Sequence, residues 1–200
     1  MIQNLKKTYF EKCPGCQQTI SWLRTKWKIW SFRLQGSGKT TTFQAITNAI
    51  FFDEGDIELY GLNTTKDFDT IRQSIGYCPQ ENALFEHLSV YDTISFYKSL
   101  KKVKESVEDI CIRFGLGKYL KTISGKLSGG NKRKLLFAIA LMNNPKILLL
   151  DEPSTGVDPE SRRMMWKKIK QLERFDGNYN MILTPIQWKK LKFFATQCHG

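Results

Sequence analysis

The sequence predicts an α/β fold in which a mainly parallel sheet carries phosphate chemistry at one edge. Three observations support this prediction. The stretch Gly36-Ser37-Gly38-Lys39-Thr40-Thr41 contains the Gly-Lys-Thr that ends a phosphate-binding loop. The apolar run Ile147-Leu148-Leu149-Leu150 is typical of a strand buried on both faces, and two carboxylates follow it. Between these signals, residues 84–127 show helical apolar spacing, which predicts an inserted helical lobe.

The bulk composition indicates a single domain that is cytosolic or faces the cytosol. Two hundred residues suffice for one domain with a core. No apolar run approaches the roughly 20 residues that cross a bilayer, and the first residues lack the apolar segment of a signal peptide. Cys13 and Cys16 have the spacing of half a zinc or redox site, but there is no second close pair. We therefore expect reduced thiols.

The net charge of +12 is carried by the two ends of the chain. Residues 1–35 carry seven Lys or Arg and one acidic residue, and residues 160–200 carry nine and three, whereas residues 36–159 carry fifteen of each. The segment 22–33 interleaves aromatic and basic residues, as membrane or single-strand contacts do. The part with the motifs is neutral, however, so we expect no nucleic-acid partner.

The remaining elements follow from periodicity and from turn residues. Strands are expected at residues 2–10, 56–60, 75–79, 147–150 and 180–184. Helices are expected at residues 39–50, 67–74, 90–101, 105–114, 131–142 and 159–172, with Ser128 as a natural cap of the fifth. This order predicts a nucleotide-binding core of residues 36–83 and 128–184, interrupted by the helical lobe of residues 84–127.

The phosphate loop works through its backbone and two side chains. Glycines let successive N–H groups point at an anion, and the dipole of the following helix adds positive potential. Lys39 supplies a charge for the β- and γ-phosphates, and Thr40 supplies a hydroxyl for Mg²⁺. The first glycine of the pattern, however, falls on Arg33.

The carboxylates Asp151 and Glu152 stand where α/β folds place their ligands, at the carboxyl end of a strand. Asp151 can hold Mg²⁺, directly or through water, because this ion takes oxygen ligands. Glu152 can polarise an attacking water. An isolated Asp-Glu would be a solvated turn, but a buried strand and a phosphate loop upstream favour the functional interpretation.

These motifs together resemble the nucleotide-binding domain of ATP-binding-cassette (ABC) transporters, over roughly residues 36–172. The most specific match is Leu127-Ser128-Gly129-Gly130-Asn131-Lys132-Arg133-Lys134-Leu135, which is similar to the family signature. Gly76-Tyr77-Cys78-Pro79-Gln80 resembles the glutamine loop, and Ser154-Thr155-Gly156-Val157-Asp158-Pro159 resembles the loop after the catalytic carboxylate. The residues of these motifs are similar to those of the A subfamily, whose members are often lipid transporters.

The resemblance implies a P-loop NTPase (RecA-like) core that binds and hydrolyses ATP with Mg²⁺. Glu152 would be the general base, and Asp151, Thr40 and Gln80 would hold the metal. The nucleotide would contact the residues Tyr9, Gly36, Ser37, Gly38, Lys39, Thr40, Thr41 and Gln80, with Tyr9 stacking on adenine. Ser128, Gly129 and Gly130 would contact the ATP of a second, head-to-tail nucleotide-binding domain. Further partners would be transmembrane domains outside this chain, which would place it at the cytosolic face of a membrane.

The chain departs from the family at both ends. Arg33 replaces a glycine, and Pro185-Ile186-Gln187-Trp188 stands where the family has a histidine. The residues after Thr184 can be encoded by codons that, when read from two bases later, give His-Ser-Met-Glu-Glu-Ala-Glu. In the segment before the phosphate loop, codons read in a shifted frame likewise give the glycine that the loop lacks. We therefore hypothesise that segments 17–35 and 185–200 are frame-shifted, so that the domain is truncated or disrupted at both ends. The coding DNA tests this directly.

Replacement of Arg33 by glycine is expected to tighten nucleotide binding. The Cβ and long side chain of Arg33 occupy space that the loop's first turn needs, so the natural chain should bind more weakly. Titration of both chains with a fluorescent ATP analogue measures the difference. Equal affinities would contradict this role of Arg33.

Two other classes of function remain open. A soluble ABC-type ATPase acting on ribosomes or nucleic acid would need a second cassette or a basic groove, and neither is evident in this sequence. The other is a non-functional remnant, since loss of the histidine should slow hydrolysis further. Membrane-spanning segments in the full gene would favour a transporter, and turnover measurements would identify a remnant.

Overall fold

The computed structural model describes residues 2–8, 17–20, 29–31, 39–51, 53–175 and 180–184. The strands are β1 (Ile2–Thr8), β2 (Gln17–Ile20), β3 (Ile29–Ser31), β4 (Glu54–Leu59), β5 (Leu62–Asn63), β6 (Ile75–Cys78), β7 (Ile147–Asp151) and β8 (Asn180–Thr184). The α-helices are α1 (Lys39–Ile46), α2 (Phe68–Ile71), α3 (Val90–Leu100), α4 (Val107–Arg113), α5 (Gly129–Leu141) and α6 (Pro159–Phe175). Short 3₁₀ turns lie at Arg72–Ser74, Gly117–Tyr119 and Ser124–Lys126.

The central sheet is parallel, in the order β3-β8-β7-β6. Its register pairs Cys78 with Leu150 and Asp151 with Thr184. All four strands therefore end at the same edge, which is where ligands bind in open parallel sheets. The sequence places the phosphate loop after β3, the glutamine loop after β6 and the carboxylates at the end of β7.

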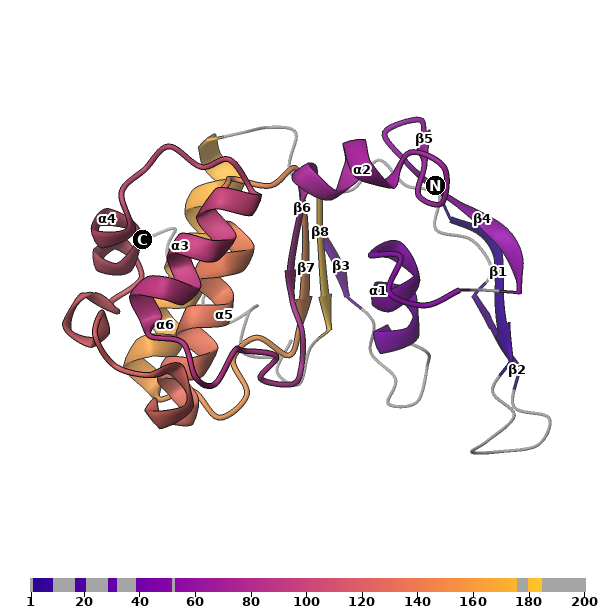
Figure 1. The fold of residues 1–200 in the computed structure, drawn as a ribbon. Helices are drawn as coiled ribbons and strands as arrows, with labels where there is room; N and C mark the ends of the chain where they lie inside the picture. The colour runs from indigo at the N-terminus through magenta and orange to yellow at the C-terminus, as the bar shows by residue number, and fades with distance from the viewer. Residues whose placement is uncertain are drawn as a thin grey trace.

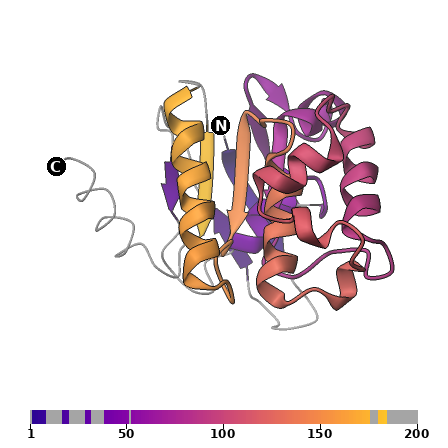
Figure 2. The same ribbon diagram turned by 90° about the vertical axis from the view of Figure 1, so that its left-hand side faces the viewer.

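Strand β7 is buried on both faces and divides the core in two. Leu148 and Leu150 pack in the cluster formed with helices α3 to α6, whereas Ile147 and Leu149 pack with α1. This alternation follows from the period of two along a strand. Figure 1 shows α1 on one face of the sheet and α3, α5 and α6 on the other, and Figure 2 shows these helices in front of the sheet.

A second, antiparallel sheet lies beyond α1, in the order β2-β1-β4-β5 (Figure 1). Ile57 of β4 and Phe43 of α1 share one buried cluster, which joins this sheet to the parallel one. Helix α1 is therefore held between two sheets, and its N-terminus is fixed relative to the carboxyl edge of β7. The sequence did not predict this antiparallel sheet.

The helical lobe contains α3 and α4, as predicted. Ser89 accepts a hydrogen bond from the amide of Asp92 at 3.0 Å, and Ser106 accepts one from Asp109 at 3.0 Å. Each serine thus caps a helix and satisfies a backbone donor that would otherwise be left free. The cap predicted at Ser128 is also present, with its hydroxyl 3.4 Å from the amide of Asn131.

The predicted elements recur with small shifts at their ends. Helix α1 ends at Ile46 rather than at residue 50, because the chain turns at Asn48, where φ is +54°. Helix α5 begins two residues earlier than predicted, directly after its cap, and α6 continues to Phe175. Strands β2, β3 and β5 were not predicted. Within the described part of the chain, every helix is too short or too polar to cross a membrane.

Candidate functional site

Thr40 and Asp151 meet at the carboxyl edge of the parallel sheet. The Thr40 hydroxyl donates to Oδ2 of Asp151 at 3.0 Å, across 111 residues of sequence. Thr40 is exposed in the first turn of α1, and Asp151, at the end of β7, is only 1% exposed. A hydroxyl beside a buried carboxylate offers the oxygen donors that Mg²⁺ prefers. The residues present therefore fit a magnesium ion at this place.

The rest of the predicted phosphate loop is described only in part. Lys39 begins α1, so its backbone lies at the helix N-terminus, and Thr41 is buried one residue beyond Thr40. Tyr9, Arg33, Gly36, Ser37 and Gly38 lie outside the described residues, as do Pro185 and the cysteines Cys13 and Cys16.

Glu152 occupies an unusual backbone conformation. Its φ is +47°, in the left-handed region that residues other than glycine seldom adopt. Such a conformation costs about 1–3 kcal/mol and persists where surrounding contacts enforce it. The amide of Thr155 donates to the Glu152 carbonyl at 3.2 Å, and the Thr155 hydroxyl lies 3.4 Å from Oε2. The carboxylate thus sits in a closed turn directly after β7.

The guanidinium of Arg133 connects α5 to this turn by hydrogen bonds. It donates to the carbonyls of Asp151 at 2.7 Å and Glu152 at 2.9 Å, and also to the carbonyl of Pro79. Sequence reasoning assigned no role to Arg133. The sequence signal that could have identified Arg133 is its charge on a helix face that also carries the buried residues Leu136, Phe137 and Ala140.

Gln80 and the signature residues lie around this edge. Gln80 is exposed and follows Pro79, whose carbonyl Arg133 binds. Ser128 and Gly129 are exposed at the start of α5. A Cβ placed on Gly130 would lie 3.4 Å from Oδ1 of Asp158, so the signature packs against the 156–158 loop. The structure therefore joins Thr40 to Asp151 directly and leaves the start of the signature facing outward.

Two titratable neighbours of Asp151, Tyr77 and Cys78, are neutral at physiological pH. Burial raises the pKa of the Cys78 thiol to about 11. Burial, and then the charge of Asp151, raise the pKa of Tyr77 to about 12. Cys78 is therefore a protonated thiol at physiological pH. Within the described ranges, no group of three or more His, Cys, Asp or Glu is arranged to hold a metal.

Comparison with known proteins identifies the family. The family model described as "ABC transporter" matches residues 34–155. The chain belongs to the ABC transporter family. The match begins in the loop region and ends just after the carboxylates, so it includes both halves of the Thr40–Asp151 site.

Curated relatives of this ABC domain are members of the A subfamily. The phospholipid-transporting ATPase ABCA3 of Homo sapiens is 40% identical over 176 residues, 84% of this chain and 10% of that protein. The ATP-binding cassette sub-family A member 7 of Mus musculus is 36% identical over 169 residues, 82% of this chain and 8% of that protein. The chain thus spans about a tenth of the length of these relatives. The predicted resemblance to the A subfamily is confirmed.

Solved structures confirm the fold. An ATP-binding subunit of an ABC transporter aligns with a TM-score of 0.81 at 18% identity, covering 96% of this chain and 81% of that one. A putative ABC transporter ATP-binding protein from Pyrococcus furiosus aligns with a TM-score of 0.70 at 26% identity, covering 92% and 89%. The predicted P-loop NTPase core and the ABC-type ATP-binding domain are therefore both confirmed.

Proposed function

We propose that this domain binds and hydrolyses ATP and supplies the energy for a transporter in the membrane. The observation that carries the proposal is the hydrogen bond between Thr40 and Asp151. It holds a hydroxyl from the phosphate-loop helix against a buried carboxylate at a strand end. Those two groups come from distant parts of the sequence and meet at the carboxyl end of β7.

Each group at the edge has a proposed task. Lys39 and the backbone of residues 36–41 bind the phosphates, and Tyr9 stacks on adenine. Thr40, Asp151 and Gln80 hold Mg²⁺, which when bound neutralises phosphate charge. Glu152 orients the attacking water and accepts its proton.

The signature residues are proposed to act on a second domain. Ser128 and Gly129 are exposed at the N-terminus of α5, a 13-residue helix whose dipole suits a phosphate. In a head-to-tail pair, Ser128, Gly129 and Gly130 would contact ATP held by the partner's phosphate loop. The chain would then contribute one ABC domain, with its core at residues 36–83 and 128–184.

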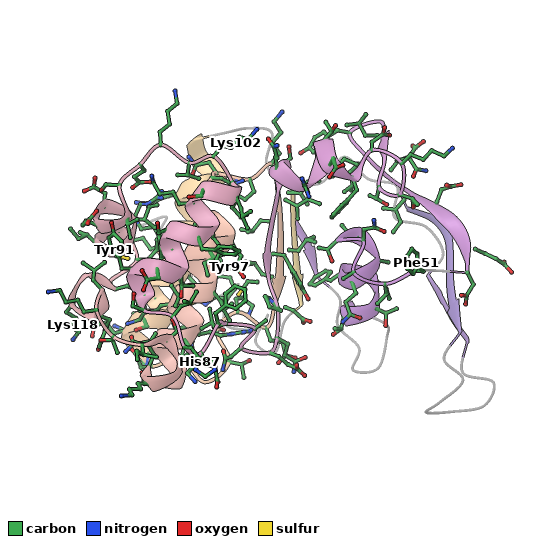
Figure 3. All side chains as sticks on the ribbon, in the orientation of Figure 1. Phe51, His87, Tyr91, Tyr97, Lys102 and Lys118 are labelled. Carbon is green, nitrogen blue, oxygen red and sulfur yellow. The ribbon has the colours of Figure 1, made fainter. Side chains whose placement is uncertain are left out.

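We propose that the membrane-spanning part of the transporter packs against an exposed aromatic cluster beside the glutamine loop. Phe85 and Phe96 are 48% and 44% exposed, and their rings lie 5.5 Å apart in a T-shaped contact. Both also contact the ring of Tyr97 on α3, which is labelled in Figure 3. Relatives named phospholipid-transporting ATPases make lipids the proposed cargo and the cytosolic face of a membrane the proposed location.

Replacement of Thr40 by alanine tests the metal site. The variant should lose the gain in ATP affinity that Mg²⁺ provides, by at least about tenfold, the lower end of what loss of a supporting metal-site contact costs. Binding of a fluorescent ATP analogue, titrated with Mg²⁺ and with EDTA, measures that gain. Thr70→Ala removes a similarly exposed threonine remote from the site and should bind as the natural chain does. Equal Mg²⁺ dependence in both variants would contradict the assignment.

A further inference from the structure

Arg133 is a buried charge within the first turns of α5. Its exposure is only 3%, although arginine is seldom buried to this degree. A guanidinium removed from water must be hydrogen-bonded to avoid a large penalty. What this charge is bonded to therefore indicates why the position is an arginine.

The three acceptors of Arg133 are backbone carbonyls from two neighbouring strand ends. Nη1 donates to Pro79, which follows β6, and Nη2 donates to Asp151 and Glu152 at the end of β7. The planar guanidinium presents several donors in a fixed fork, so it can bind carbonyls of two segments at once. A lysine has a single nitrogen and cannot reproduce this geometry.

The contact matters most for Glu152. Its φ of +47° is unfavourable for a residue with a side chain, and the backbone conformation sets the direction in which the carboxylate leaves the chain. Arg133 donates hydrogen bonds to the carbonyls of Asp151 at 2.7 Å and Glu152 at 2.9 Å, which flank the φ and ψ angles of Glu152. The same guanidinium holds Pro79, and thereby the position from which Gln80 extends.

We infer that Arg133 is a positioning residue that fixes the Glu152 turn and the start of the glutamine loop relative to the signature helix. Arg133 does not touch the nucleotide in this scheme; it acts through the backbone that carries Glu152 and Gln80. The inference rests on the proposed role of Glu152 in hydrolysis. It adds a mechanical link, because the helix capped by the exposed Ser128 is hydrogen-bonded to the turn that carries Glu152, the proposed general base.

The test compares Arg133→Ala and Arg133→Lys with Arg113→Ala in the full chain. Arg113 is also partly buried and bonded, to Glu105 at 2.7 Å, but it lies in the helical lobe. Steady-state ATP hydrolysis and ATP binding are measured for each. Arg133→Ala should lower kcat by roughly 10- to 100-fold, as misplacement of a catalytic group does, with KM changed by less than about threefold. Arg133→Lys should recover only part of kcat, and Arg113→Ala should keep it.

Amide hydrogen exchange separates this inference from the proposed function. Arg133→Ala should speed exchange at Thr155, whose amide is bonded to the Glu152 carbonyl, whereas Arg113→Ala should not. If neither the natural chain nor Arg33→Gly hydrolyses ATP, the proposed function fails, but the exchange result still decides whether Arg133 holds the turn. Unchanged exchange at Thr155, or equal losses of kcat in the two alanine variants, would overturn the inference. If Arg133→Ala fails to fold, Arg133→Lys provides the same two measurements.

Discussion

Replacement of Glu152 by glutamine should slow ATP hydrolysis by roughly 10²- to 10⁴-fold, the usual contribution of a positioned general base. Glutamine keeps the size of the side chain and leaves Asp151 and Thr40 in place, so ATP binding should be retained. The effect should appear in kcat with little change in KM, because the base acts only in the chemical step. Phosphate release at saturating Mg²⁺ and ATP, together with analogue binding, measures both quantities.

Glu160→Gln is the matched control for this prediction. Glu160 is exposed in the first turn of α6, a few residues beyond the site, and the same charge is removed there. This variant should hydrolyse ATP at the rate of the natural chain. A Glu152→Gln variant that kept its rate would show that another group accepts the proton.

Replacement of Gly76 by alanine should markedly destabilise the fold. A Cβ at this position would lie 2.1 Å from the Ala140 carbonyl oxygen and 2.6 Å from a Pro145 carbon. Strand β6 and the end of α5 would have to separate, at a cost of about 3 kcal/mol, the upper end of the usual overpacking range. In a chain of this size, the melting temperature should fall by about 6 to 12 °C.

Gly129→Ala provides the control for the stability measurement. A Cβ there meets nothing within 4 Å, at the first residue of α5. Because alanine restricts the unfolded chain, its effect should be stabilising and within about 1 kcal/mol. Thermal or urea unfolding followed by circular dichroism compares the two variants. Equal melting temperatures would mean that β6 and α5 do not approach as closely as the structure indicates.

Strong local signals explain why the parallel core could be predicted. Strand β7 has a continuous apolar run, and α3 and α4 have apolar residues at helical spacing, so sequence alone located them within a few residues. Strand β2, Gln17-Gln18-Thr19-Ile20, is polar and short, and it is defined by pairing with β1. Strand β5 has two residues. No local pattern marks such strands, because their stabilisation comes from hydrogen bonds to distant partners.

The sequence predicted those parts of the site that act through a characteristic side chain. The family resemblance implied that Thr40 and Asp151 both hold Mg²⁺, and the structure brings the two side chains together. The role of Arg133 was not predicted, since its acceptors are backbone carbonyls, which every residue carries. The left-handed conformation of Glu152 could not be predicted from the sequence either, because glutamate has no preference for it.

Mg²⁺-dependent phosphate release from ATP is the most direct measurement of whether this domain is an ATPase. The natural chain and Arg33→Gly are each assayed with Mg²⁺ and with EDTA, against Glu152→Gln in the same background. We predict slow turnover by the natural chain, faster turnover after Arg33→Gly, and loss of both in EDTA or with Glu152→Gln. If neither chain released phosphate faster than its Glu152→Gln counterpart, hydrolysis at the Thr40–Asp151–Glu152 edge would be contradicted.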